Sequence, residues 1–141
     1  MILMRWILIL LAVMGITTSA LALREHYRTD TSPCSINERW DCGIVNHSPY
    51  ATLAGVPVAA IGITGYLLLA VLAFKQAYRL MLVPVLAALA FSLYLARIEQ
   101  HVLGVWCLYC VISLGVISLL ALLVLAKVLV SSVKGATTPQ P

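Results

Sequence analysis

The residues best suited to chemistry in this chain are its four cysteines, which occur as two pairs. Cys34 and Cys42 enclose seven residues, whereas Cys107 and Cys110 form a C-x-x-C motif. In a helix, residues three apart share a face, so the second pair can close a disulfide across one turn or point together toward a neighbouring helix. A helix N-terminus favours a thiolate and apolar surroundings disfavour it, so the sequence leaves the sign of any pKa shift open. Two such pairs favour thiol–disulfide exchange.

The elements that must position these cysteines are strongly apolar. Of 141 residues, 62% are hydrophobic and 10% are charged, whereas soluble domains carry about 25% charged residues. All charged residues fall outside four apolar stretches, each long enough to cross a bilayer as a helix. These predicted transmembrane helices are residues 6–23, 56–74, 80–96 and 106–126. We therefore predict an all-α integral membrane protein, with a four-transmembrane-helix bundle over residues 1–130 and a disordered cytoplasmic tail at 131–141.

The distribution of charge predicts the orientation, because Lys and Arg are retained on the cytoplasmic side. With both termini cytoplasmic, the inner side has five basic residues and no acidic ones, namely Arg5, Lys75, Arg79, Lys127 and Lys134. The outer side then has four basic and five acidic residues. The net charge of +4 is explained by this topology, and the scattered basic residues argue against nucleic-acid binding. All four cysteines are thus expected on the oxidising, non-cytoplasmic side. We expect this to be the periplasmic side of a bacterial inner membrane, although a membrane of the endoplasmic reticulum would show the same distribution of charge.

The connections between the predicted helices differ greatly in length. The outer loop 24–55 is the only long one, and loops of that size are usually functional. The segments 75–79 and 97–105 are predicted only to join neighbouring helices. An alternative for 6–23 is a cleaved signal peptide, although its apolar run is longer than the about 7 to 15 residues typical of such signals.

Two cysteine pairs suit a relay, because a soluble protein cannot reach an oxidant that is dissolved in the bilayer. An outer pair would collect electrons and an inner pair would pass them on. Zinc binding is an alternative, but zinc usually takes two closely spaced pairs, so no metal is predicted. A third interpretation is that the four cysteines form two purely structural disulfides. The spans have no haem or nucleotide motif, so a quinone is the expected acceptor, and Phe91 and Tyr94 are candidates to line its pocket.

Other residues add to the cysteine pattern. Ser48 follows Cys42 by six positions and begins Ser48-Pro49-Tyr50-Ala51, which leads to Gly55-Val56-Pro57, and Trp106 directly precedes the C-x-x-C motif. Together these residues resemble the vitamin K epoxide reductase family of four-helix membrane oxidoreductases, over about residues 6 to 128. An unrelated four-helix disulfide-forming quinone reductase has its cysteine pairs in both outer loops, which is not the arrangement here.

The resemblance implies a role for each matching residue. Cys107 and Cys110 match the active-site pair of the family, with Cys110 next to the quinone. Cys34 and Cys42 match its loop pair, with Cys42 exchanging with Cys107 and Cys34 engaging the partner protein. Ser48 matches a serine or threonine that the family uses near the active site.

The chain also departs from the vertebrate members of that family. Those proteins place an asparagine and a tyrosine as hydrogen-bond donors to vitamin K, where this chain has Val58 and Leu114. The resemblance therefore favours a bacterial-type member that reduces ubiquinone or menaquinone and serves a separate extracytoplasmic thioredoxin-fold protein. The predicted function is a thiol:quinone oxidoreductase that supports disulfide formation. The alternatives are a vitamin K (quinone) epoxide reductase and a non-catalytic membrane scaffold whose outer loop is stapled by disulfides.

Overall fold

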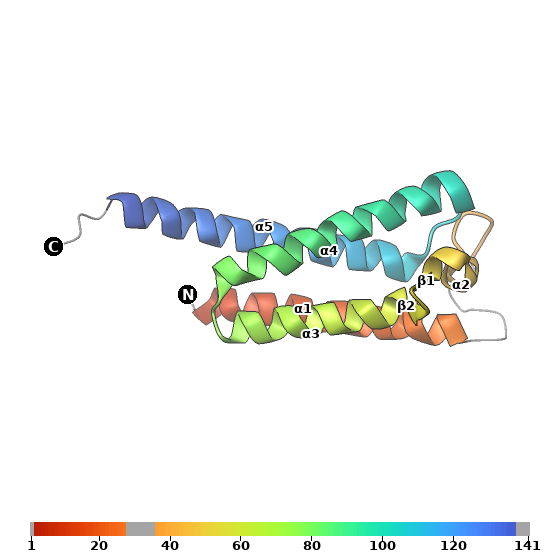
Figure 1. Ribbon diagram of the computed structural model, residues 1–141, viewed down its shortest axis with the longest axis horizontal. Coiled ribbons are helices and arrows are strands. Elements are labelled where there is room, and N and C mark those ends of the chain that lie inside the picture. Colours follow the sequence, from red (N-terminus) through yellow and green to blue (C-terminus); the bar gives the residue numbers. More distant parts are fainter. Residues whose placement is uncertain (1, 28–35, 138–141) are drawn as a thin grey trace.

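Four long helices lie side by side along the length of the molecule (Figure 1). The computed structural model describes residues 2–27 and 36–137, so Cys34 lies outside the described residues. The helices are α1 (Ile2–Tyr27), α3 (Val58–Phe74), α4 (Tyr78–Ile98) and α5 (Leu108–Thr137). Successive long helices run in opposite directions, so the beginning of α1 and the end of α5 lie at the same end of the bundle (Figure 1).

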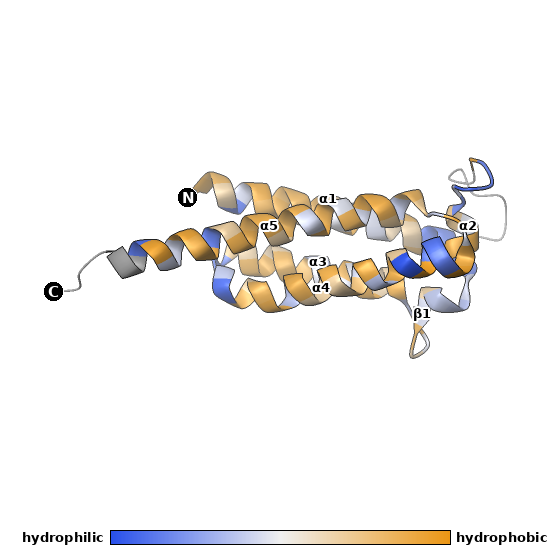
Figure 2. Cartoon of the chain, turned by 90° about the horizontal axis from the view of Figure 1, so that it is seen from above, coloured by the Kyte–Doolittle hydropathy of each residue, from blue (hydrophilic) through white to orange (hydrophobic). Residues whose placement is uncertain are grey.

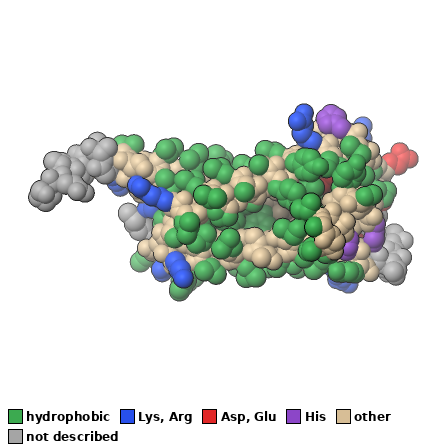
Figure 3. Space-filling view, in the orientation of Figure 1, with side chains coloured by type: hydrophobic (Ala, Val, Ile, Leu, Met, Phe, Trp, Pro, Cys, Tyr) green, Lys and Arg blue, Asp and Glu red, His purple; other side chains and the backbone are tan. Residues whose placement is uncertain are grey.

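The outer surface of the bundle is apolar. Three segments are long and apolar enough to cross a membrane, Ile2–Tyr27, Tyr78–Leu103 and Leu108–Lys134, and α3 is a shorter apolar helix. Hydrophobic side chains cover the middle of the molecule in the view of Figure 3, and the hydrophilic residues gather toward the two ends in Figure 2. Lipid is the solvent that suits such a surface, so the chain is a multi-pass integral membrane protein.

The interior of the bundle is a packed apolar core to which all four long helices contribute. Its largest fully buried members are Leu8, Leu69, Met81, Val85, Ile117, Leu120 and Val124. α5 packs against both α1 and α4, and α3 packs against α1. α1 and α3 pack tightly at Gly15, where a Cβ atom would collide with the ring of Tyr66. Glycine is therefore required there by packing.

Short elements cover the end of the bundle at which α5 begins. α2 (Cys42–His47) starts at the N-cap residue Asp41, whose side chain accepts the Ile44 N–H at 3.2 Å. A 3-10 turn (Pro49–Ala51) leads into a two-residue hairpin of β1 (Thr52–Leu53) and β2 (Val56–Pro57). At the same end, α4 passes into a π-helical turn over Glu99–Leu103. We call this end of the molecule the cysteine end.

The structure corrects the predicted course of the chain in three places. Residues 131–137 were predicted to belong to a disordered tail, but they are helical and continue α5. The apolar sequence of α5 that precedes these residues contains no helix-breaking proline, so the helix extends through them. The helix predicted at 106–126 begins at Leu108, so Cys107 precedes it. The segment 97–105 does more than join helices, since most of it is helical and three of its side chains, Ile98, Glu99 and Val105, are buried at the cysteine end.

Candidate active site

Cys107 and Cys110 are free thiols at the beginning of α5. The Cys107 side chain is fully buried, and its carbonyl oxygen accepts the N–H of Val111 at 3.0 Å, as the residue before a helix does. Cys110 lies one turn later and is half-buried. A hydrogen bond joins the two thiols. The C-x-x-C motif thus holds two sulfur atoms together at a helix N-terminus.

Cys42, the first residue of α2, is fully buried and disulfide-bonded. It belongs to the same small buried cluster as Cys107, together with Val45 and Val105. Backbone hydrogen bonds fix this arrangement at Trp106, whose N–H donates to the Arg39 carbonyl at 2.6 Å and whose carbonyl accepts the Asp41 N–H at 2.9 Å. The loop cysteine and the C-x-x-C motif are therefore held beside each other by main-chain bonds.

Asn46 connects the two cysteines directly. Its side-chain amide donates to the Cys42 carbonyl at 2.8 Å and to the Cys107 sulfur at 3.4 Å. The residue is only 6% exposed, and its own carbonyl is hydrogen-bonded by the ring of His26 at 2.7 Å. Sequence analysis missed Asn46. Its position one helical turn after Cys42 was the available signal, since the two residues share a face of α2.

These contacts give the sign of the pKa shift that the sequence left open. Cys107 lies outside the membrane-crossing segments, between the end of one and the start of the next. The hydrogen bond from Cys110, and more weakly the one from Asn46, lowers the pKa of the Cys107 thiol, while burial and the nearby Glu99 charge raise it. The net pKa is below the ordinary value for cysteine. Cys107 is therefore suited to react as a thiolate in disulfide exchange, either as the attacking or as the departing sulfur.

Glu99, in the π-helical turn after α4, is the second residue that sequence analysis missed. Its side chain is 4% exposed, and its Oε2 atom accepts the Cys107 N–H at 3.2 Å. The carboxyl group is also hydrogen-bonded with the Cys110 thiol. A buried ionisable side chain inside a membrane protein is costly and is usually functional, and π-helical turns are frequent at functional sites. The presence of a carboxyl group eight residues before the motif was the available signal.

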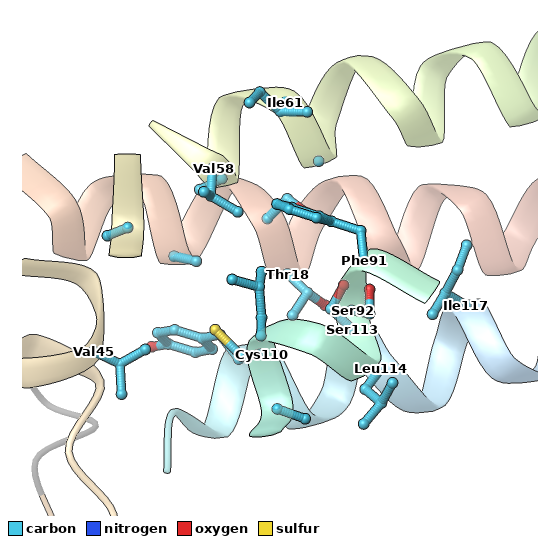
Figure 4. Close-up of a pocket in the computed structure, with 18 of the residues that line it drawn as sticks. Thr18, Val45, Val58, Ile61, Phe91, Ser92, Cys110, Ser113, Leu114 and Ile117 are labelled. Atoms are coloured by element: carbon cyan, nitrogen blue, oxygen red, sulfur yellow. The ribbon is translucent and has the colours of Figure 1, made fainter. Parts of the chain in front are cut away.

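A cavity of about 370 Å³ opens beside Cys110. Residues of α1, α2, α3, α4 and α5 line it, and most of them are apolar. Figure 4 shows Cys110 facing this space, with Thr18, Val58 and Phe91 around it. A polar spot is formed by Tyr66, whose hydroxyl group donates to the Ser113 carbonyl at 2.9 Å. An apolar pocket with a few polar groups is typical of a site for a small hydrophobic molecule.

The predicted substrate-binding residues fall into two groups. Ser48, Val58, Phe91 and Leu114 line the cavity. Tyr94 does not, because it is 56% exposed and lines a smaller hollow nearby, although its ring stacks on Phe91 with centroids 6.2 Å apart. The structure therefore brings Phe91, and not Tyr94, to the main cavity.

Ser48 also has a structural task at the end of α2. Its hydroxyl group donates to the Val45 carbonyl at 2.7 Å, and its backbone N–H donates to the same oxygen at 3.3 Å. These bonds satisfy a carbonyl that the end of the helix leaves without an intrahelical partner. Within residues 2–27 and 36–137, no group of three or more His, Cys, Asp or Glu side chains is placed to hold a metal ion.

Comparison with known proteins identifies the family of the chain. A search of curated proteins finds no significant match to the chain. The sequence profile described as the vitamin K epoxide reductase family matches residues 6–125, which is most of the chain and includes all four cysteines. The chain therefore belongs to the vitamin K epoxide reductase family and is a membrane oxidoreductase.

Proposed function

We propose that this protein is a thiol:quinone oxidoreductase that oxidises a soluble partner protein and reduces a membrane quinone. One observation carries the proposal: the disulfide-bonded Cys42 packs in one cluster with the free thiol of Cys107, whose neighbour Cys110 lines an apolar cavity. This is an ordered series of sulfur atoms from the loop to a pocket for a hydrophobic molecule. Each transfer between neighbours is a thiol–disulfide exchange.

The reaction runs in three balanced steps. The partner's dithiol reduces the disulfide of Cys42, which we assign to Cys34, and the partner leaves oxidised. Cys42 then attacks Cys107 in a Cys107–Cys110 disulfide, and Cys34 resolves the mixed disulfide, so that the loop disulfide forms again. Finally, the Cys107–Cys110 dithiol passes two electrons and two protons to the quinone, which becomes a hydroquinone. A disulfide-bonded Cys42 with free thiols at Cys107 and Cys110 is the arrangement that this scheme requires before quinone reduction.

The partner is proposed to be a separate thioredoxin-fold protein on the extracytoplasmic side. In this arrangement all four long helices cross the membrane and both termini are cytoplasmic. Charge supports it, because Lys75 and Arg79 flank the turn from α3 to α4, which lies at the end of the bundle opposite the cysteines (Figure 1). Arg5, near the start of α1, and Lys127, in the second half of α5, lie on the same half of the bundle. Basic residues are retained on the cytoplasmic side of a membrane.

A respiratory quinone such as ubiquinone or menaquinone suits the cavity better than a quinone epoxide does. At Val58 and Leu114, where vertebrate relatives provide hydrogen-bond donors to vitamin K, the cavity wall is apolar. These side chains can pack on the ring but can donate no hydrogen bond to it. The epoxide reductase remains the second candidate through family membership.

The test is anaerobic quinone reduction by the full chain in detergent, with a reduced thioredoxin-fold protein as the donor. We expect turnover in the wild type, none in Cys110→Ala, and loss of donor-driven turnover in Cys34→Ala. Ser132→Ala is the matched control, because this exposed residue lies toward the far end of α5. It should turn over like the wild type.

Three results would contradict the proposal. Full quinone reduction by Cys110→Ala would exclude the C-x-x-C pair as the last electron donor. Turnover with vitamin K epoxide but with no quinone would support the epoxide reductase. No turnover with either acceptor would support the non-catalytic scaffold, in which the cysteines form only structural disulfides.

A further inference from the structure

Glu99 is a buried carboxyl group for which disulfide exchange itself has no use. In the part of the chain that the structure describes, the buried carboxyl side chains are Glu25 and Glu99. Of these two, Glu99 lines the cavity beside Cys110. Burial of a carboxyl group carries a free-energy cost that packing alone does not recover. Its position at the thiols and at the pocket calls for a role in the reaction.

The contacts of Glu99 place it between the two groups of the final step, the C-x-x-C thiols and the cavity proposed for the quinone. One carboxylate oxygen accepts the Cys107 N–H at 3.2 Å, which fixes the side chain against the start of α5. The carboxyl group is hydrogen-bonded with the Cys110 thiol, the sulfur that faces the cavity. We propose that Glu99 carries protons from the C-x-x-C thiols to the quinone oxygens. This inference rests on the proposed function and names the group that moves its protons.

The proton balance requires a carrier. When the dithiol reduces a quinone, two S–H bonds break, one S–S bond forms, two electrons enter the ring, and two O–H bonds form. Glu99 accepts the Cys110 proton, gives it to a quinone oxygen and returns to the carboxylate form. The Cys107 proton then follows the same path. Glu99 therefore ends each turnover in the state in which it began.

No other described side chain at the cysteine end offers this combination of acidity and position. His26 is hydrogen-bonded to the Asn46 carbonyl and His47 to the Gly43 carbonyl, and neither lines the cavity. The Tyr66 hydroxyl group lines the cavity but already donates to Ser113. General acid–base catalysis requires a group within hydrogen-bond reach of the proton that it moves, and Glu99 has that reach to Cys110.

The first experiment compares Glu99→Gln with Glu25→Gln in single-turnover quinone reduction by pre-reduced protein. Glutamine keeps the size of the side chain and can still accept the Cys107 N–H, but it cannot carry a proton. We expect Glu99→Gln to be slower by about 100-fold or more, the usual contribution of a general acid–base group. Its solvent deuterium isotope effect should rise, because proton transfer becomes rate-limiting. Glu99→Asp should recover part of the rate, and Glu25→Gln is the control for replacing a buried carboxyl group.

The second experiment needs no quinone. Infrared difference spectra between the dithiol protein and the protein oxidised by diamide should contain a carboxyl change that disappears in Glu99→Gln and remains in Glu25→Gln. A slower Glu99→Gln without a larger isotope effect would mean a structural role and would overturn the inference, as would a wild-type spectrum with no Glu99 change. If the wild type reduced no quinone but kept the Glu99 change, the proposed function would fail while proton exchange between Glu99 and the thiols would stand.

Discussion

Replacement of Asn46 by leucine should make Cys107 less reactive at neutral pH and more reactive at high pH. Leucine has a similar size and is apolar, so it fills the buried position but removes both side-chain bonds, to the Cys42 carbonyl and to the Cys107 sulfur. The second bond stabilises the thiolate. Without it, the pKa of Cys107 must rise from its lowered value.

The size of the effect follows from the geometry. Hydrogen bonds to charged groups contribute about 1.5 to 3 kcal/mol, and the 3.4 Å distance to sulfur places the Asn46 bond at the weak end of that range. A loss of about 1.5 kcal/mol corresponds to about one pKa unit. At a pH below both pKa values the thiolate fraction then falls about 10-fold, while the remaining thiolate is about 3-fold more nucleophilic. Cys107 should thus react about 3-fold to 4-fold more slowly at neutral pH and about 3-fold faster once fully ionised.

The assay is alkylation of Cys107 by iodoacetamide as a function of pH, followed by mass spectrometry in a Cys110→Ser background. Serine keeps a hydroxyl donor beside Cys107, so the background retains that part of the site. His47→Ala is the control, because it removes a bond within α2, from the ring to the Gly43 carbonyl at 2.8 Å, and touches no sulfur. An unchanged pH midpoint in Asn46→Leu would refute the reasoning, and so would an equal shift in His47→Ala.

Two further predictions concern packing and the cavity. Gly15→Ala should destabilise the protein by about 1 to 3 kcal/mol, because its Cβ would collide with the Tyr66 ring; thermal unfolding in detergent should show this loss, and Gly65→Ala, with open space at its Cβ, should not. Phe91→Ala should raise the KM for quinone by about 10-fold or more, because loss of an aromatic contact costs at least about 1.4 kcal/mol. Tyr94→Ala should raise it less, since Tyr94 lies outside the main cavity, and an equal effect of the two variants would contradict the assignment of the cavity as the quinone site.

The sequence predicted the long apolar helices and singled out the cysteines as candidates because both signals are local. A charge-free apolar run marks a membrane helix by its own composition, and the C-x-x-C spacing is read within one turn. Asn46 and Cys107 are 61 positions apart, so their contact depends on how the loop folds back. Glu99 resembled a solvated charge in a short link, and its burial follows from the continuation of α4 into a π-helical turn. Phe91 and Tyr94 lie three apart on α4, and only the rotation of that helix decides which one reaches the cavity.

The backbone bonds between Trp106 and the residues on either side of Trp40 have a kinetic consequence. They involve main-chain atoms alone, so they can persist whichever cysteines are oxidised. Cys42 then meets Cys107 as a tethered reactant, and the exchange proceeds at a high effective concentration instead of waiting for the loop to diffuse back. Electron transfer inside the protein should therefore be insensitive to protein concentration and fast compared with the arrival of the soluble donor, so that turnover is governed by encounters outside the molecule.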